Sequence, residues 1–296
     1  MTLSHCALCP RRCGARREAE RGEGRCGVGS LPVVARAALH FGEEPCITGT
    51  RGSGAVFFCG CPLHCAYCQN NEISESAARG QVLTVDELGA VFQRLAAQGA
   101  HNINLVTAGH FLPAVAEALR RHPPGIPVVY NSSGYETIEA LRLLEGLVDI
   151  YLPDFKYADA DLAALLSDAP DYPEVALSAI AEMRRQTGAE VIDKEGIMQR
   201  GTLVRHLVLP GLSGASMRAL AMLRDALPAD IRISLMGQYT PHGRAAAMAG
   251  LDRPLSAKAY RVVAAQMRAL RFDGYLQPPE ASGMEMVPAW DGTGVR

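Results

Sequence analysis

Apolar residues in this chain fall into short continuous runs separated by longer stretches with helical spacing. Runs without alternation are typical of strands buried on both faces, as in a parallel sheet. Glycine, proline or polar residues follow each run, which is where a strand would end. Six such runs lie at residues 54–60, 103–107, 127–131, 148–152, 203–209 and 231–236.

The segments between these runs have the spacing of amphipathic helices. The clearest begins at the capping box Thr84-Val85-Asp86-Glu87, and apolar residues from Leu88 to Leu95 recur at helical spacing until Gly99 ends the helix. Strands that alternate with helices indicate a parallel sheet with right-handed crossovers, and therefore an α/β fold. Further helices are predicted near residues 113–120, 174–187, 215–227 and 256–270, with another that ends at Gly146.

Composition narrows the class of protein. The chain has 296 residues, of which 48% are hydrophobic, so it can bury a large core. A net charge of −2 gives no electrostatic reason to expect nucleic acid or a membrane surface as a partner. The sequence contains no run of about 18 apolar residues and does not open with a signal peptide. We therefore expect a cytoplasmic enzyme.

All nine cysteines lie at or before Cys68, which divides the chain into two parts. We expect residues 1–50 to be a cysteine-rich, metal-binding segment and residues 51–296 to form the barrel-sized domain. Clustered cysteines favour metal in a reducing compartment over scattered disulfides. The first segment offers four thiols for a structural zinc ion or a second iron–sulfur cluster. Free cysteines in a flexible leader are the alternative, and the four residues are Cys6, Cys9, Cys13 and Cys26.

A second group of cysteines follows the first apolar run. Cys61-Pro62-Leu63-His64-Cys65-Ala66-Tyr67-Cys68 is a C-x3-C-x2-C motif with an aromatic residue before the third cysteine. Three thiolates this close can hold three irons of a cubic 4Fe–4S cluster and leave the fourth iron open for a substrate. A zinc site or a redox disulfide is the alternative, since C-x2-C pairs occur in both.

This motif resembles the signature of the radical S-adenosylmethionine (radical SAM) superfamily. The resemblance implies that Cys61, Cys65 and Cys68 bind the cluster and that S-adenosylmethionine binds the open iron. It also implies that an electron from the cluster cleaves a carbon–sulfur bond to release a 5′-deoxyadenosyl radical. The superfamily fold is a partial (β/α)6 TIM-type barrel, which matches the six predicted strands.

In a parallel barrel the chemistry lies at the carboxyl ends of the strands. Polar residues recur at these ends, although core packing does not require them there. The candidate segments, in strand order after the cysteine loop, are Thr107–His110, Asn131–Gly134, Asp154–Lys156, Arg205–His206 with Pro210–Gly211, and Met236–Tyr239.

Several of these segments also resemble the family named for pyruvate formate-lyase activating enzymes. Tyr130–Tyr135, Asp149–Tyr157, Arg205–Gly211 and Ser234–Tyr239 fit its motifs, together with Cys6–Cys26 and Phe57–Asn70. One departure is that activating enzymes carry Gly-Gly-Glu-Pro-like residues after the second strand, where this chain has Ala108-Gly109-His110. The resemblance implies a cofactor-binding set of Tyr67, Ala108, Gly109, His110, Ser132, Ser133, Asp154 and Lys156, in which Tyr67 lies against the adenine.

The substrate is the least determined part of the prediction. His206, Gln238 and Tyr239 are candidates to face it, and Cys46 and Cys59 are expected to be packed thiols without a ligand role. A neutral, hydrogen-bonding set of strand ends suits a peptide backbone, so we expect a protein substrate such as a glycine loop of a glycyl-radical enzyme. Flavodoxin or ferredoxin would donate the electron. Two alternatives are a radical enzyme acting on a small molecule and a non-catalytic electron carrier or scaffold.

Overall fold

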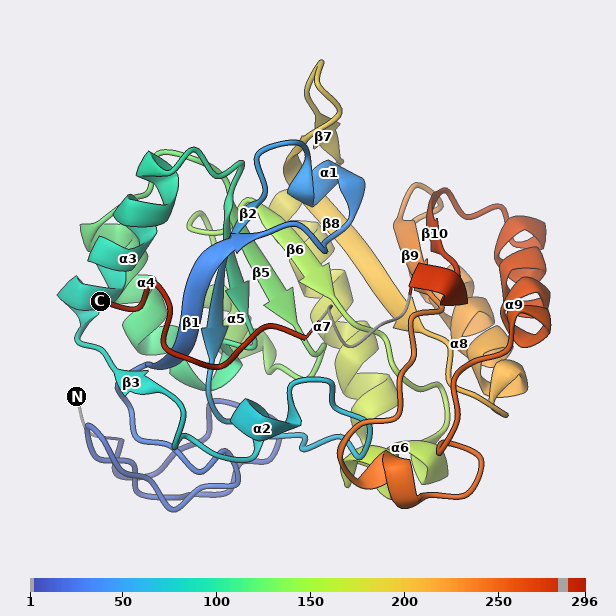
Figure 1. The fold of residues 1–296 in the computed structure, drawn as a ribbon, viewed down its shortest axis with the longest axis horizontal. Helices are drawn as coiled ribbons and strands as arrows, with labels where there is room; N and C mark the ends of the chain where they lie inside the picture. The colour runs from blue at the N-terminus through green and yellow to red at the C-terminus, as the bar shows by residue number, and fades with distance from the viewer. Residues whose placement is uncertain (1–2, 282–286) are drawn as a thin grey trace.

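A computed structural model describes residues 3–281 and 287–296 of the chain (Figure 1). In this described part, ten strands form one sheet in the order β10-β9-β8-β6-β5-β4-β2-β1-β3, and β7 pairs with β8. The strands are β1 (Val33–His40), β2 (Ser53–Phe58), β3 (Gln81–Val82), β4 (Ile103–Val106), β5 (Val128–Ser132), β6 (Ile150–Pro153), β7 (Val191–Ile192), β8 (Met198–Leu207), β9 (Arg232–Met236) and β10 (Gly274–Gln277).

The predicted α/β class and all six predicted strands are confirmed. Strands β2, β4, β5, β6, β8 and β9 pair in parallel with one another, and the sheet stays open as a partial barrel. The sequence reading missed β10, which extends this parallel order beyond β9. Its four residues alternate between exposed and half-buried, so they lack the continuous apolar run that marked the other strands.

The helices cover the sheet and connect its strands. The capping box of the helix α3 (Val85–Ala97) is formed as predicted, with the Thr84 hydroxyl accepting from the Glu87 amide. The last predicted helix, near residues 256–270, begins after Ser256, an exposed N-cap whose hydroxyl accepts from the Ala259 amide. The helices are α1 (Pro45–Thr48), α2 (Asn71–Ser74), α3 (Val85–Ala97), α4 (Leu112–Arg121), α5 (Ile138–Arg142), α6 (Ala160–Ser167), α7 (Tyr172–Thr187), α8 (Ser213–Ala226) and α9 (Ala257–Ala269), with short 3-10 turns η1 (Gly109–Phe111), η2 (Gly243–Ala247) and η3 (Pro279–Ala281).

Strand β1 connects the N-terminal segment to the barrel. It runs antiparallel to β2, so the sheet already begins before residue 50, while the first four cysteines lie ahead of it. The end of the chain lies along β1, where Gly292 and Thr293 exchange backbone hydrogen bonds with Ala35 and Ala37 (Figure 1). This pairing covers part of an edge that would otherwise present unpaired backbone groups.

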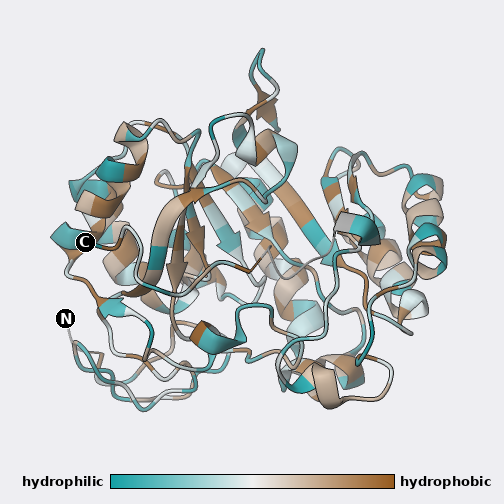
Figure 2. Cartoon of the chain, viewed as in Figure 1, coloured by the Kyte–Doolittle hydropathy of each residue, from teal (hydrophilic) through white to brown (hydrophobic). Residues whose placement is uncertain are grey.

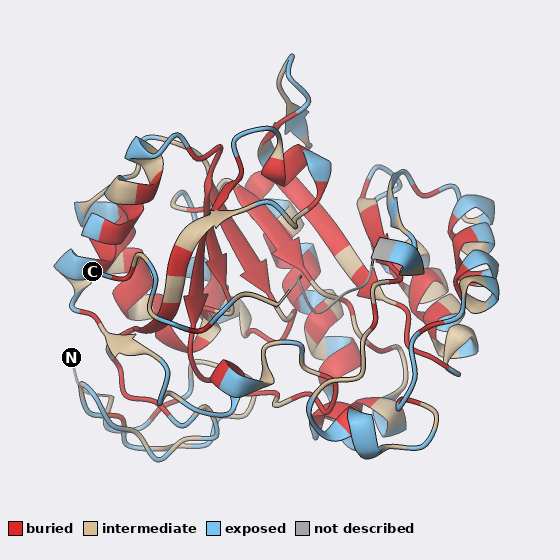
Figure 3. Ribbon diagram, viewed as in Figure 1, coloured by how far each residue is buried: buried red, intermediate tan, exposed pale blue. Residues whose placement is uncertain are grey.

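The core follows from the hydrophobic pattern. Figure 2 shows hydrophobic residues along the central strands, and Figure 3 shows that these strands are the most completely buried part of the sheet. The loops of the N-terminal segment are instead largely exposed or half-buried. No helix in the described residues is long and apolar enough to cross a membrane.

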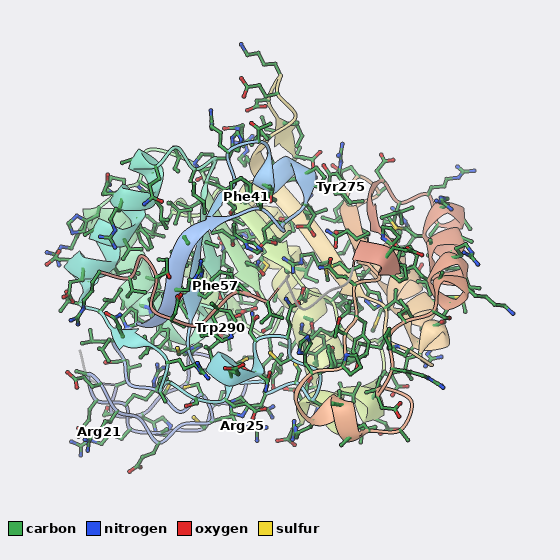
Figure 4. The ribbon with its side chains drawn as sticks, in the orientation of Figure 1. Arg21, Arg25, Phe41, Phe57, Tyr275 and Trp290 are labelled. Atoms are coloured by element: carbon green, nitrogen blue, oxygen red, sulfur yellow. The ribbon has the colours of Figure 1, made fainter. Side chains whose placement is uncertain are left out.

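One aromatic contact fixes the end of the chain to the barrel. The rings of Trp290 and Phe57 meet edge to face with centroids 5.3 Å apart (Figure 4), and only 7% of Trp290 is exposed. We expect Trp290→Ala to lower the free energy of unfolding by about 3 kcal/mol, because it leaves a cavity beside the sheet edge. Leu165→Ala, at a side chain that is 67% exposed, should change it by less than about 0.5 kcal/mol. Denaturant titration compares the two, and equal losses would contradict this prediction.

Candidate active site

The C-x3-C-x2-C motif forms the loop between β2 and α2, at the carboxyl end of β2. Cys61, Cys65 and Cys68 all line one cavity. The loop begins at Gly60, whose φ of 81° favours glycine and whose missing side chain leaves room for the Cys26 carbonyl oxygen, 2.5 Å from the position of a Cβ. The Ser167 hydroxyl donates to the Cys65 sulfur at 3.0 Å, which anchors the loop against α6.

The chemistry of these three thiols fits a cluster. Burial raises the pKa of Cys61 to about 12 and that of Cys68 to about 11, so binding iron must displace protons from them. Within the described ranges, no three Cys, His, Asp or Glu side chains are gathered as a site for one metal ion. A 4Fe–4S cluster instead takes each cysteine on a different iron.

The remaining cavity wall comes from the ends of the parallel strands, as expected from the topology. The structure brings six of the predicted residues into the wall with the three cysteines: Tyr67, Ser132, Ser133, Asp154, Lys156 and Gln238. Thr107, Asn131 and Arg205, from the candidate strand ends, line it too. The Ser132 hydroxyl is already engaged, because it donates to Glu136 at 2.6 Å and accepts from the Gly134 amide.

Three residues predicted to bind the cofactor, Ala108, Gly109 and His110, are not among the described residues that line the cavity. The His110 ring is buried, and its Nε2 lies 2.8 Å from the Cys59 carbonyl oxygen. Burial lowers the pKa of His110 to about 3, so this ring is neutral. The histidine therefore supports the turn before the cysteine loop. At this strand end Val106 and Thr107 are the residues that reach the cavity.

Two substrate candidates, His206 and Tyr239, also point elsewhere. Arg205 and Leu207 line the cavity, so the alternation along β8 turns His206 to the other face, where its Nδ1 lies 2.6 Å from the Phe155 carbonyl oxygen. The Tyr239 hydroxyl donates to the Leu251 carbonyl oxygen, and its ring lies against Tyr67. Of the three candidates only Gln238 lines the cavity.

The sequence reading missed Glu43, which follows β1 and lines the cavity. One carboxylate oxygen accepts from Asn104 and Asn131, at 3.0 and 3.3 Å, and the other accepts from the Arg205 guanidinium at 3.0 Å. The available signal was the acidic pair Glu43-Glu44, which follows shortly after the apolar residues of β1, in a segment where no strand was expected.

The charges of the cavity wall are paired with one another. The Lys156 ammonium lies 2.5 Å from the Asp154 carboxylate. Although burial alone would lower it, the pKa of Lys156 is held well above its usual value by Asp154. Arg205 pairs with Glu43 and also approaches Asp154 at 3.6 Å. Among the described residues of this wall, the cationic side chains of Lys156 and Arg205 therefore each have an acidic partner.

A second missed carboxylate lies directly behind the wall. Glu136 accepts hydrogen bonds from Ser132 and Tyr130 and is buried. Its Oε1 lies 3.2 Å from where a Cβ of Gly109 would stand, so a side chain at Gly109 would crowd this carboxylate. Burial raises the pKa of Glu136 to about 7 in spite of these two hydrogen bonds.

Cys46 and Cys59 are packed thiols, as predicted. Both are buried, and each belongs to a cluster of apolar side chains. Neither is among the described residues that line the cavity.

Comparison with known proteins identifies the class that this fold and cysteine loop define. The family model of the radical SAM superfamily matches residues 55–223, which is more than half of the chain. The chain therefore belongs to the radical SAM superfamily. Membership implies a 4Fe–4S cluster and S-adenosylmethionine, and the three cavity-lining thiols are the residues that fit the cluster.

One relative is an uncharacterized protein of Methanocaldococcus jannaschii, 28% identical over 264 residues that cover 86% of this chain and 71% of the relative. Among solved structures, Streptococcus suis SuiB bound to precursor peptide SuiA gives a TM-score of 0.48 at 7% identity over 73% of this chain. The matched region spans 46%, or about half, of SuiB. Methylornithine synthase (PylB) gives 0.46 at 15% identity, covering 75% of this chain and 70% of that enzyme. Similarity at this level does not indicate a shared substrate.

The ligand assignment makes a direct prediction about iron. We expect Cys65→Ala to lower the iron content by about four atoms per chain and to abolish cleavage of S-adenosylmethionine, because a cluster missing one of three ligands is not retained. The control is Cys59→Ala, which removes a buried thiol outside the cavity and should leave both measurements near wild type. Iron analysis after anaerobic reconstitution and assay of 5′-deoxyadenosine check this. Loss of cleavage in Cys59→Ala together with full activity in Cys61→Ala would contradict the assignment.

Glu136 predicts a pH dependence of stability. The pKa of Glu136 is raised in the folded protein from 4.5 to about 7. Below pH 4.5 the carboxyl group is neutral in both the folded and the unfolded chain. As the pH rises towards 7 it ionises first in the unfolded chain, which lowers the stability of the folded protein. We expect Glu136→Gln to remove this pH-dependent loss of stability. The free energy of unfolding of the variant, relative to that of wild type, should therefore rise by about 3 kcal/mol between pH 4.5 and pH 7.

Denaturant unfolding at several pH values measures the difference. The matched control is Glu139→Gln, at an exposed position on α5, whose stability should follow that of wild type across the same range. A constant difference between Glu136→Gln and wild type would show that Glu136 titrates alike in the folded and unfolded chain.

Proposed function

We propose that this radical SAM enzyme abstracts hydrogen from a segment of a protein partner, and that a glycine loop of a glycyl-radical enzyme is the target. The single observation that carries the choice of substrate is the pairing of charges on the cavity wall. Lys156 forms an ion pair with Asp154, and Arg205 forms one with Glu43. A phosphorylated or carboxylated metabolite would need a free cation or a glycine-rich helix start to bind it.

The cofactor pair supplies the reactive species. When bound, the 4Fe–4S cluster and S-adenosylmethionine supply a 5′-deoxyadenosyl radical by one-electron reductive cleavage. A primary carbon radical can take hydrogen from most carbon atoms, so the protein must choose the target by position. The residues of this chain therefore act by holding the cofactor and excluding other donors.

The positions of the cavity-lining residues suggest which of them would bind the cluster and which would bind S-adenosylmethionine. Cys61, Cys65 and Cys68 would hold the cluster, and Tyr67 would lie against the adenine. The Asp154–Lys156 pair would face the polar groups of the cofactor, since both side chains line the cavity close to the cysteine loop. Ser133 is better placed than Ser132 to donate to the cofactor through its hydroxyl, because the Ser132 hydroxyl already donates to Glu136.

A peptide backbone fits the part of the wall that is left for a substrate. Asn131 and Gln238 offer neutral amide groups, which can donate to a carbonyl and accept from an amide of an extended chain. This supports the activating-enzyme-like assignment suggested by the motifs. We further propose flavodoxin or ferredoxin as the electron donor and the cytoplasm as the compartment, since all nine cysteines are free thiols that a reducing environment preserves.

The proposal can be tested by following deuterium. Extract from cells grown with α-deuterated glycine is separated into macromolecules and small metabolites, and each fraction is added to reduced enzyme with S-adenosylmethionine. We expect the macromolecular fraction to accelerate formation of 5′-deoxyadenosine at least tenfold and to transfer deuterium into it, because the radical takes hydrogen from a glycine. Mass spectrometry of 5′-deoxyadenosine measures both effects.

The control is Cys65→Ala, which should form no 5′-deoxyadenosine with either fraction. Fast turnover of the small-metabolite fraction alone would overturn the choice of a protein substrate. Acceleration by macromolecules without deuterium transfer would keep a protein substrate but exclude glycine as its target.

A further inference from the structure

The segment before β1 is organised with little regular structure. Between residues 3 and 31 it contains only isolated bridges, such as those of Arg17 with Leu3 and Gly22, and no helix. Figure 1 shows it as a set of loops beside β3. Loops with few apolar residues do not hold one conformation without a further bond or ligand.

The four cysteines of this segment come together in the fold. Cys6 exchanges backbone hydrogen bonds with Gly14 and Ala15, which closes the loop that carries Cys9 and Cys13. The sulfurs of Cys13 and Cys26 lie 3.4 and 3.7 Å from the position of a Cβ on Gly24. The three other thiols also act electrostatically on Cys9. All four are free and unlinked by disulfides.

A buried positive charge lies against this group. Arg17 is 0% exposed, and its guanidinium donates to the carbonyl oxygens of Val28 and Gly29 and to the Cys6 sulfur at 3.6 Å. The guanidinium also lies over the ring of Phe111, 5.7 Å from its centroid. No carboxylate of the described residues forms an ion pair with it. Burying an unpaired charge costs several kcal/mol, so this guanidinium calls for an anion next to Cys6.

We propose that Cys6, Cys9, Cys13 and Cys26 bind a second 4Fe–4S cluster, and that Arg17 balances its charge. A 4Fe–4S cluster bound by four thiolates carries a net negative charge. It would therefore give the Arg17 guanidinium the anionic partner that it lacks among the described residues. Zinc on four thiolates would carry a negative charge as well, with its sulfurs about 3.8 Å apart because each Zn–S bond is about 2.3 Å. We choose the cluster because this segment packs directly against the loop of the radical-site cysteines.

The position of this site relates it to the radical cluster. The Cys26 carbonyl oxygen packs on Gly60, the residue before Cys61, and Arg11 donates to the Pro62 carbonyl oxygen inside the cysteine loop. Arg25 also pairs with Asp168, near the Ser167 that holds Cys65 (Figure 4 labels Arg25). The proposed cluster would therefore stabilise the surface on which the radical-site loop rests.

Metal analysis of variants that separate the two sites tests this inference. After anaerobic reconstitution with iron and sulfide, we expect wild type to hold about eight irons and eight sulfides per chain. A variant with Cys61, Cys65 and Cys68 changed to serine leaves the N-terminal thiols untouched and should keep about four of each, with the electron paramagnetic resonance signal of a reduced cubane. Changing the four N-terminal cysteines to serine should remove the other four irons. This result does not depend on the identity of the substrate.

The role of Arg17 needs its own pair of variants in the background without radical-site cysteines. Arg17→Met should lose the remaining cluster or shift its reduction potential to lower values, because a neighbouring positive charge favours the reduced form. Arg17→Lys keeps the charge and should stay close to the parent protein. An unchanged potential and iron content in Arg17→Met would overturn the charge-balancing role. About one zinc per chain, or no metal in the variant that lacks the radical-site cysteines, would overturn the second cluster itself.

Discussion

Parallel strand pairing is the constraint on which the rest of this structure depends. Because β2, β4, β5, β6, β8 and β9 run in the same direction, their carboxyl ends meet at one edge. Segments separated by more than a hundred residues thereby share one cavity, as Cys61 and Gln238 do. Without this alignment the cysteine loop would have no wall of polar residues opposite it, and no place in which a reactive radical could be shielded from water.

Buried charge shapes both halves of the chain in different ways. On the cavity wall each of the two cations, Lys156 and Arg205, has a carboxylate partner. Asp154 comes from the same strand end as Lys156, whereas Glu43 joins the end of β1 to Arg205 on β8. In the N-terminal segment Arg17 is buried without such a partner among the described residues. Because an isolated buried charge is costly, the paired charges of the cavity wall do not call for an ionic ligand. The buried Arg17 guanidinium is the observation behind the proposed second cluster, whose thiolates would supply the missing negative charge.

The N-terminal cysteines and the cysteines of the C-x3-C-x2-C loop also lie on segments that pack against each other. The turn at Gly60 has room for the Cys26 carbonyl oxygen only because it lacks a side chain, and His110 supports the same turn from β4 through the Cys59 carbonyl oxygen. His110 was expected to contact the cofactor and instead supports the loop that carries Cys61, Cys65 and Cys68. A residue at a strand end can thus serve the site from behind without touching what binds there.

The sequence by itself determined the α/β class, the six central strands and the radical SAM cysteine loop, because these depend on local apolar runs and on spacing within eight residues. It could not determine which side of a strand each polar residue occupies, so His206 was placed in the cavity beside Arg205, whereas the pleat separates them. Glu43 and Glu136 were also missed. Their roles arise from contacts with residues that are distant in the sequence or behind the cavity wall. Only the tertiary structure decides such contacts, because they depend on how whole strands and helices pack together.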